Sequence, residues 1–439
     1  MGRLKLAGPM VVAVLLFGAL PAPAFGFTGF SNMQADATFG EQMTFSVELT
    51  GGEPDELELL MQFAGSDSTL VAPVQPDGDQ ATYVWDAADR YVVPNTEIDY
   101  QWRATEDGRT TLSAEESLLY DDDRPGLDWQ AAVIGEATVH WYGGNEQVAR
   151  HLGELTAGGA AQAEDLLGHE MDGAVDIFIY DAREDFFGAL GPGAREWFGA
   201  ATFPPLRTIF MWLGAGPASY LETTVVHEVT HVVFQDATVN AFHDPAKWLN
   251  EGLATWAEQR AADVQQSTVE SEASRGGLLS FDAIAYDFPF GTRGATLSYA
   301  MGTTMVDMII DRYGEDAIAR IAEAYRTGSS DDEALEEGTG VPADQLYADY
   351  YDSFGVDEPD PVEAAAIPPS DVDKPGGAQA PGASADESRA GSSEEPAPSE
   401  TIMDPPIVVV VAVAGLAILG IAGFAAWSAR RRGRDGEPS

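Results

Sequence analysis

The sequence contains no cysteine and little positive charge. Among its 439 residues, 23 are Lys or Arg and 72 are Asp or Glu, which gives a formal net charge of −49. Without cysteine there can be no disulfide bond, no thiolate nucleophile and no cysteine-ligated zinc, so any metal must be bound by His, Asp or Glu. The negative charge repels nucleic-acid phosphates and anionic lipid headgroups. We therefore expect no nucleic-acid partner.

The chain nevertheless has enough apolar residues to fold. Hydrophobic residues make up 45% of the sequence and aromatic residues 10%. At about 100–200 residues per domain, the length leaves room for two or three domains. A chain that is disordered throughout is excluded.

Both ends carry apolar segments, but of different kinds. Residues 1–26 show the basic start, short apolar run and small residues of a secretory signal peptide, with cleavage after Ala24 or Gly26. Near the other end, the uncharged run from Ile407 to Trp427 would cross a bilayer core of about 30 Å as a helix. Several arginines follow it, and the positive-inside rule places such an end in the cytoplasm.

These segments predict a single-pass protein of the cell membrane, with its N-terminal ectodomain outside and its C-terminus cytoplasmic. We assign a transmembrane helix to 405–428 and a short basic tail to 429–439. Residues 357–404, rich in Pro, Ala, Ser, Gly and acids, are typical of a disordered stalk. The membrane is thus an expected partner through one C-terminal helix. An uncleaved N-terminal anchor remains the alternative for the first segment.

Residues 27–122 have the pattern of an antiparallel β-sandwich, for which an immunoglobulin-like fold is one candidate. Short runs of alternating apolar and polar residues are separated by turns rich in Gly, Pro, Asp and Asn. Its aromatic residues, such as Trp85 and Trp102, are interpreted as core or cross-strand residues. The acidic turn at 121–126 marks the end of this domain, and no catalytic group is evident within it.

Residues 128–356 predict an α+β domain. Three strand-like segments, at 137–142, 174–180 and 207–213, come first, and the pattern then becomes helical almost to the end. The predicted fold class of the whole chain is therefore α+β. It has an N-terminal antiparallel β-sandwich, then a domain with a small sheet and a helical C-terminal half, and finally a single transmembrane helix.

A metal-binding pattern lies in the predicted helix at about 217–236. His227, Glu228 and His231 form the sequence HEVTH. Two histidines at positions i and i+4 share one face of a helix and can reach the same ion, while the intervening Glu projects beside the open coordination position. Catalytic zinc normally has three protein ligands and a water, so a third ligand must come from elsewhere. The segment 248–259, WLNEGLATWAEQ, supplies Glu251 on a second predicted helix.

HEVTH followed by WLNEGLA resembles the gluzincin metallopeptidases, the clan of thermolysin and aminopeptidase N, and more narrowly the bacterial peptidase MA-like domain. The resemblance covers about 128–356. It implies that His227, His231 and Glu251 bind one catalytic zinc ion and that Glu228 is the general base. Zinc lowers the pKa of its bound water towards about 7, and Glu228 can take that proton for attack on a scissile carbonyl.

Further residues are weighed around this pattern. Tyr299, in the sequence Tyr-Ala-Met-Gly, matches the Tyr-x-x-Gly helix of the aminopeptidase branch, which implies that its hydroxyl stabilises the oxyanion; a buried helix residue is the alternative. Thr255 could support a ligand or could lie on a helix surface. His243 is interpreted as a surface residue in a loop.

Part of the family pattern is missing. The Gly-x-Met-Glu-Asn sequence with which aminopeptidases hold a substrate amino terminus is absent from 211–222. Aminopeptidase activity is therefore not predicted. We expect the strand at 207–213 to form the sheet edge that pairs with an extended substrate.

The sequence as a whole predicts a membrane-anchored extracellular zinc metallopeptidase that acts on a peptide or protein substrate. Two alternatives remain open. One is a non-catalytic cell-surface binding protein with a relic zinc domain. The other is a zinc hydrolase of a non-peptide amide or ester, which would use the same ligands.

Overall fold

The computed structural model describes residues 26–359 except 67, 192–198, 259–261 and 290–291. These residues divide into two compact units between Asp121 and Asp122. The predicted transmembrane helix and basic tail lie outside the described residues, as do nearly all of the predicted signal peptide and stalk. Within the described ranges, no helix is both long and apolar enough to cross a membrane.

The first unit is built from two antiparallel sheets. One sheet has the strand order β1-β2-β5; the other has the order β4-β3-β6-β7, with β8 also pairing with β6. The strands are β1 (Gly29–Thr38), β2 (Gln42–Thr50), β3 (Glu56–Phe63), β4 (Thr69–Pro73), β5 (Gln80–Asp86), β6 (Thr96–Glu106), β7 (Arg109–Leu112) and β8 (Glu116–Tyr120).

Alternation along the strands produces the core of this sandwich. In β2, every second residue from Met43 to Leu49 is buried, as the period-two pattern predicts. The opposite sheet contributes Trp102, which is fully buried, and β5 contributes Trp85, which is 3% exposed. The two sheets therefore pack on one shared hydrophobic core, and the interpretation of these tryptophans as core residues is confirmed.

The second unit contains a five-stranded mixed sheet with the order β12-β13-β11-β10-β9. Strands β10, β11 and β13 are parallel to one another, whereas β9 and β12 run antiparallel to their neighbours. The strands are β9 (Gln130–Ile134), β10 (Ala137–Trp141), β11 (Val175–Tyr180), β12 (Ala200–Phe203) and β13 (Thr208–Trp212).

The expectation that the strand at 207–213 forms the sheet edge is wrong. That segment is β13, which lies between β11 and β12. A short 3-10 helix, Pro204–Leu206, connects β12 to β13. Strand β12 pairs antiparallel with β13 and occupies the side of β13 that was expected to be a free edge. The edge on this side of the sheet is β12.

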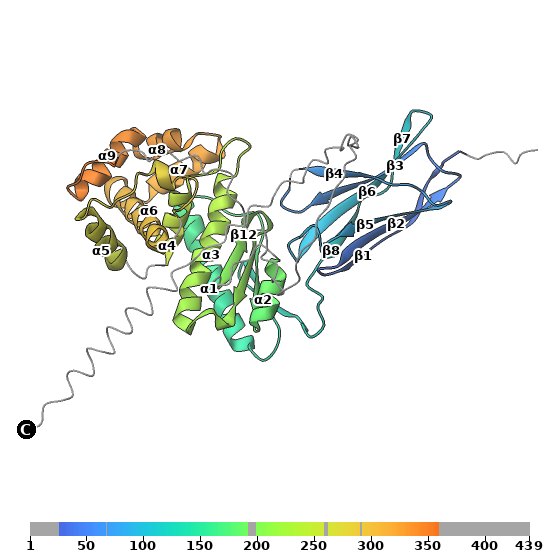
Figure 1. Cartoon of the computed structure of the whole chain (residues 1–439), viewed down its shortest axis with the longest axis horizontal. Helices are drawn as coiled ribbons and strands as arrows, with labels where there is room; N and C mark the ends of the chain where they lie inside the picture. The colour runs from blue at the N-terminus through green and yellow to red at the C-terminus, as the bar shows by residue number, and fades with distance from the viewer. Residues whose placement is uncertain (1–25, 67, 192–198, 259–261, 290–291, 360–439) are drawn as a thin grey trace, which may run out of the picture. The chain divides into compact units, whose positions relative to one another are not determined.

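Helices cover both faces of this sheet (Figure 1). Helices α1 (Glu146–Leu167) and α3 (Ala218–Thr238) pack on the face that presents Ile177 and Ile209. On the opposite face, side chains of α2 (Arg183–Leu190) contact an aromatic group that includes Tyr180. Alternation along β11 explains the division, because neighbouring residues in a strand point to opposite faces.

The remainder of the unit is helical, as the sequence predicts. Three tyrosines on the last helix, Tyr347, Tyr350 and Tyr351, are at most 9% exposed and belong to the core. The elements are α4 (Lys247–Ala257), α5 (Ala262–Ala273), α6 (Thr292–Tyr313), α7 (Asp316–Arg326), α8 (Asp331–Thr339) and α9 (Ala343–Ser353), with 3-10 turns at Leu213–Ala215 and Asp282–Ile284.

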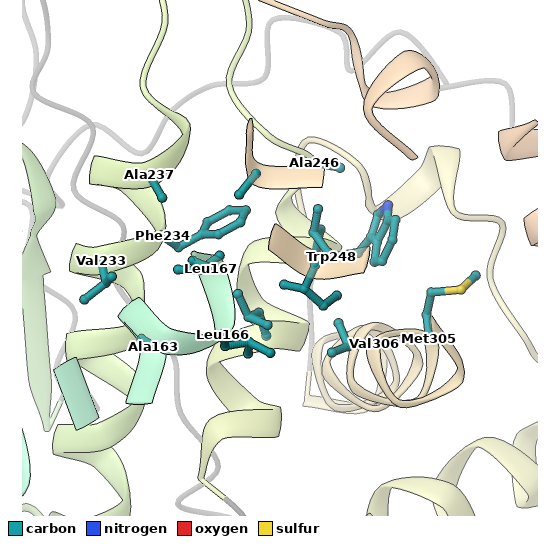
Figure 2. Close-up of a cluster of buried hydrophobic side chains, with 14 of the residues drawn as sticks. Ala163, Leu166, Leu167, Val233, Phe234, Ala237, Ala246, Trp248, Met305 and Val306 are labelled. Carbon is teal, nitrogen blue, oxygen red and sulfur yellow. The ribbon is translucent and has the colours of Figure 1, made fainter. Parts of the chain in front are cut away.

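One hydrophobic cluster joins the sheet-covering helices to the helical half (Figure 2). Leu167 of α1 and Phe234 of α3 lie in the same group of side chains as Trp248 of α4 and Val306 of α6. Each of these residues is at most 2% exposed. Truncating a buried residue of this size typically costs about 3–5 kcal/mol, so the cluster fixes the positions of four helices that surround the candidate site.

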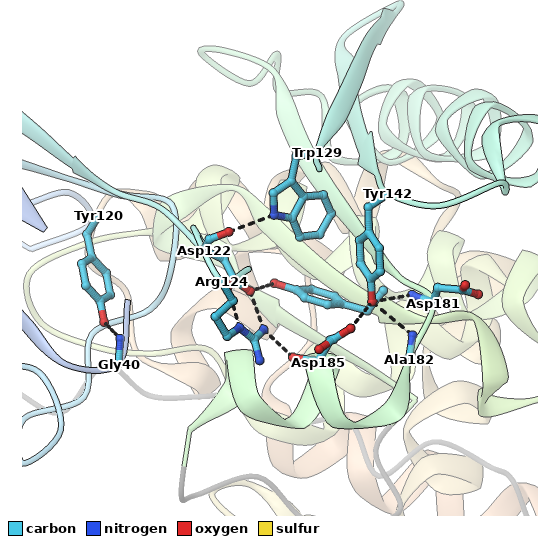
Figure 3. A network of polar contacts seen from close by, with 10 residues as sticks. Gly40, Tyr120, Asp122, Arg124, Trp129, Tyr142, Asp181, Ala182 and Asp185 are labelled. Carbon is cyan, nitrogen blue, oxygen red and sulfur yellow. Dashed lines mark hydrogen bonds and ion pairs between the residues drawn. The ribbon is translucent and has the colours of Figure 1, made fainter. Parts of the chain in front are cut away.

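A buried ion pair anchors the start of the second unit (Figure 3). Asp122 is 1% exposed and forms two hydrogen bonds with the Arg124 guanidinium. Its carboxylate also accepts a bond from the Tyr180 hydroxyl, and Arg124 donates to the backbone carbonyl of Asp185 on α2. These bonds satisfy the buried charges and tie the first residues of this unit to β11 and α2.

Two glycines allow α4 and α6 to approach each other closely. A Cβ atom at Gly302 would lie 2.4 Å from the carbonyl oxygen of Trp248, and one at Gly252 would lie 2.5 Å from the backbone carbon of Gly302. Both obstacles are backbone atoms, which cannot move without separating the helices. The Gly of the Tyr-Ala-Met-Gly sequence is therefore a packing residue that holds α6 against the helix of Glu251.

We expect Gly302→Ala to destabilise the protein by about 1–3 kcal/mol, because the added methyl group forces α4 and α6 apart. Thermal or urea unfolding would measure the effect. Gly158→Ala is the matched control: Gly158 is exposed in α1 and a Cβ there meets no atom within 4 Å. Because alanine has a higher helix propensity than glycine, this variant should be more stable than wild type by up to about 1 kcal/mol. Equal stabilities of the two variants would contradict the packing role.

Candidate metal centre

Helix α3 brings the HEVTH residues into the interior of the second unit. His227, Glu228 and His231 are 3%, 1% and 0% exposed. The two imidazole rings lie 4.8 Å apart, as expected for positions i and i+4 of one helix. A buried polar cluster of this kind is costly unless its members are paired, so their partners decide what the site can do.

Helix α4 places Glu251 against both histidines. Its Oε2 atom lies 3.6 Å from Nε2 of His227 and 3.5 Å from Nε2 of His231. One ligand atom from each of the three residues lies within 4.8 Å of the others, and they form the one such group of three or more His, Asp or Glu found in the described ranges. The structure thus brings together the three residues that the sequence proposes as ligands.

The same three atoms lack hydrogen-bond partners among the described residues. They are Nε2 of His227, Nε2 of His231 and Oε2 of Glu251, all buried. Leaving a buried polar atom unpaired costs about 1–3 kcal/mol, and three that point at one another indicate a missing shared partner. A cation satisfies all three at once. Two imidazoles and one carboxylate form the ligand set of a catalytic zinc site, whereas structural zinc sites use four protein ligands.

The other nitrogen of each ring is held by a residue of α4 or of its C-terminal cap. Nδ1 of His227 lies 2.8 Å from Oε1 of Glu258, and Nδ1 of His231 lies 2.7 Å from Oδ1 of Asn250. Both acceptors require Nδ1 to carry the proton, which leaves Nε2 of each ring with a lone pair directed at the shared position. Such contacts orient the ligand rings and increase their basicity.

The charges of the protein's own groups favour a cation here. Burial lowers the pKa of His227, but the carboxylates of Glu251 and Glu258 outweigh it and raise the pKa to about 10. Burial raises the pKa of Glu251, but the two histidines hold it well below its usual range. The site therefore contains strong attraction for positive charge. A metal ion takes the place of the proton on Nε2, because ligand imidazoles are neutral.

Glu228 has a hydrogen-bond partner on the sheet rather than on α4. Its Oε2 atom accepts a hydrogen bond from the Thr202 hydroxyl of β12. Burial raises the pKa of Glu228, and the nearby histidines and Thr202 only partly offset this effect. A carboxylate with a raised pKa is suited to accept a proton and return it.

Tyr299 lies beside the ligands on α6. Its ring centre is 6.5 Å from that of His227, and the ring packs edge-on against Phe288 at 5.1 Å. Burial, together with the charges of Glu251 and Glu228, raises the pKa of Tyr299 well above 10. The hydroxyl therefore remains protonated at neutral pH and can donate a hydrogen bond. Tyr299 is 5% exposed, so it is both a buried residue and a neighbour of the site.

The remaining sequence candidates do not join the site. Thr255 is buried, at 6% exposure, so it is no surface residue, and its hydroxyl has no partner within the described part of the chain. It makes no hydrogen bond to a ligand. His243 is exposed in the loop between α3 and α4, as predicted.

Sequence reasoning did not find Asn250, Glu258 or Thr202. Asn250 directly precedes Glu251, and Glu258 follows it by two helical turns on the same face. A histidine that binds a metal usually donates its other ring N–H to an acceptor, and a search for such acceptors could have indicated Asn250 and Glu258. Thr202 gave no signal, because it lies in a short strand whose pairing depends on the order of the sheet.

A family comparison agrees with this geometry. Residues 156–354 match the Peptidase MA superfamily. The matched region contains α3, α4 and α6, and with them the three candidate ligands, Glu228 and Tyr299. This match supports a gluzincin-type peptidase. A comparison with curated proteins finds no match.

Several solved structures resemble the chain at low identity. One is an M1 zinc metallopeptidase from Deinococcus radiodurans, at 14% identity and a TM-score of 0.35, covering 79% of this chain and 98% of that one. A mutant of that enzyme bound to a Tyr-Ser-Ala substrate matches at 14% identity and a TM-score of 0.34, covering 74% and 93%. An aminopeptidase N family protein from Idiomarina loihiensis matches at 10% identity and a TM-score of 0.34, covering 74% and 60%. We infer function from the family match and the geometry of the site.

We expect Glu258→Ala to weaken zinc binding by about 10–100-fold, because His227 loses the acceptor that orients its ring. Competition with a chromophoric chelator would measure the affinity. Glu222→Ala is the control: Glu222 lies on α3, but its carboxylate contacts His151 rather than a ligand. An unchanged zinc affinity in Glu258→Ala would show that the contact does not support the metal centre.

Proposed function

We propose that this protein is a zinc-dependent metallopeptidase that hydrolyses peptide bonds. The observation that carries the proposal is the convergence of three buried, unpartnered ligand atoms from His227, His231 and Glu251, next to Glu228. The match of residues 156–354 to the Peptidase MA superfamily supports the same activity. The proposed metal is one catalytic zinc ion.

The residues of the site have distinct roles in this proposal. A zinc ion held by the three ligands would polarise the scissile carbonyl and lower the pKa of a coordinated water to about 7. Glu228 accepts the proton of the attacking water and later donates it to the leaving amine. Its raised pKa favours this exchange, because a carboxyl group that is protonated more easily is a better proton carrier near neutral pH.

Tyr299 supplies a hydrogen bond to the developing oxyanion in this proposal. Its phenol is held protonated by burial and by the carboxylates around it. The close contact of α4 and α6 at Gly252 and Gly302 fixes the helix that carries it. A donor fixed before the reaction stabilises the transition state without reorganisation, which is why such donors contribute strongly to catalysis.

We further propose that the enzyme is anchored in the cell membrane with its catalytic unit outside. This part rests on the sequence alone, through the signal-peptide pattern at 1–26 and the apolar run at 405–428.

The first experiment compares wild type with Glu228→Gln on a diverse peptide library, using the region 27–404 and mass spectrometry of the products. Loss of the general base should lower cleavage by about 10²–10⁴-fold while zinc remains bound. Glu222→Gln, the same change at a partly exposed position of α3, should cut like wild type. If folded, zinc-loaded wild type and Glu228→Gln are equally silent, the protein is a binding module or hydrolyses another bond. The positions of the cuts would separate terminal trimming from internal cleavage.

Tyr299→Phe should lower kcat by about 10²–10³-fold with little change in KM, because the lost hydrogen bond is formed chiefly in the transition state. Steady-state kinetics on a peptide identified in the library would measure both constants. Tyr286→Phe, at a position 85% exposed, is the control. A wild-type kcat in Tyr299→Phe would leave Tyr299 only its packing role.

A further inference from the structure

The edge strand of the sheet in the second unit touches the candidate general base. Thr202, in β12, donates its hydroxyl proton to Oε2 of Glu228 on α3. Thr202 is 0% exposed and Glu228 is 1% exposed, so water does not compete for the bond. The two residues lie in different elements and come together only through the tertiary fold.

Thr202 is the hydrogen-bond donor that the described residues offer to this carboxylate. The histidines on either side of Glu228 in HEVTH are committed elsewhere: their Nδ1 atoms bond to Glu258 and Asn250, and their Nε2 atoms face Glu251. A buried carboxylate without a donor is strongly disfavoured. The hydroxyl of Thr202 therefore fixes the direction of the Glu228 carboxylate.

The backbone around Thr202 is well placed to hold such a bond rigidly. Thr202 pairs with Ile209 of β13, and its neighbours Ala201 and Phe203 are both 0% exposed. A β-branched side chain has few accessible rotamers, and a paired strand fixes the backbone beneath it. The hydroxyl thus has one defined position relative to α3.

We infer that Thr202 is a positioning residue for Glu228. By holding Oε2, it leaves Oε1 as the carboxylate atom that accepts the proton of the attacking water. The inference rests on the proposed function, in which Glu228 is the general base. It assigns to the sheet edge a part in catalysis that does not involve contact with the metal.

Kinetics of three variants test the role. Thr202→Val keeps the shape and removes the hydroxyl, and should lower kcat by about 10–100-fold with KM and bound zinc unchanged, since a misdirected group loses about this much. Thr202→Ser keeps the hydroxyl and should recover most of the kcat. Thr208→Val is the control, because Thr208 is buried in the adjacent strand and its hydroxyl donates to the carbonyl of Leu206.

Thermal unfolding of the metal-free protein provides a second readout. Thr202→Val should lower Tm by about 2–6 °C in the wild-type background, because it leaves the buried Glu228 without a donor. In a Glu228→Leu background, Thr202→Val should lower Tm by less or should raise it. In that double variant both side chains of the contact are apolar, so no buried polar group loses its partner. This comparison depends on the contact itself and requires neither zinc nor a substrate.

The outcomes are distinguishable. An unchanged kcat in Thr202→Val, a loss that Thr202→Ser does not recover, or a loss accompanied by loss of zinc would each overturn the positioning role. Equal Tm shifts in the two backgrounds would also overturn it. If wild type cuts no peptide, the proposed function fails, and the comparison of the two backgrounds then decides whether Thr202 holds Glu228.

Discussion

The second unit depends on a buried cluster of charged groups that its own residues do not neutralise. Glu228, Glu251 and Glu258 surround His227 and His231, and all but Glu258 are almost completely buried. If both imidazoles are neutral, the three ionised carboxylates leave the interior strongly negative, and burial of such charge costs several kcal/mol per ion. A divalent cation removes most of that excess. The same feature that makes the site costly without a metal therefore makes it a strong metal site.

The surrounding helices fix the positions of the charged groups in this cluster. Helix α4 supplies one candidate ligand, Glu251, and the acceptor Asn250, and its C-cap residue Glu258 supplies the second acceptor that orients a histidine ring. Helix α6 is held against α4 by the glycine contact, and the hydrophobic cluster of Figure 2 ties both to α1 and α3. A change in the spacing of α3 and α4 would move ligands and orienting groups together. Packing far from the candidate metal site thus determines the geometry of its residues.

Features that depend on residues close together in the sequence could be predicted, whereas features that depend on contacts between distant segments could not. The HEVTH and WLNEGLA segments are local, so the residues that the structure groups around one position could be named in advance. Three of the five strands of the sheet were also evident from their apolar runs, but the strand order was not, because it depends on pairing between distant segments. For this reason β13 was expected at the edge, and β12, which is short and uniformly buried, was not anticipated. The partner of Glu228 was missed with it.

The division between helix and sheet explains how one helix can carry both the ligands and the base. Successive residues of a helix are rotated by about 100°, so Glu228 cannot face in the same direction as His227. The histidines face α4, where Glu251, Asn250 and Glu258 hold them, whereas Glu228 reaches Thr202 on β12. Each set of groups is thus fixed by a different neighbour. In the proposed function, the scissile bond would have to be reached by the metal held on one side of α3 and by Glu228 held on the other.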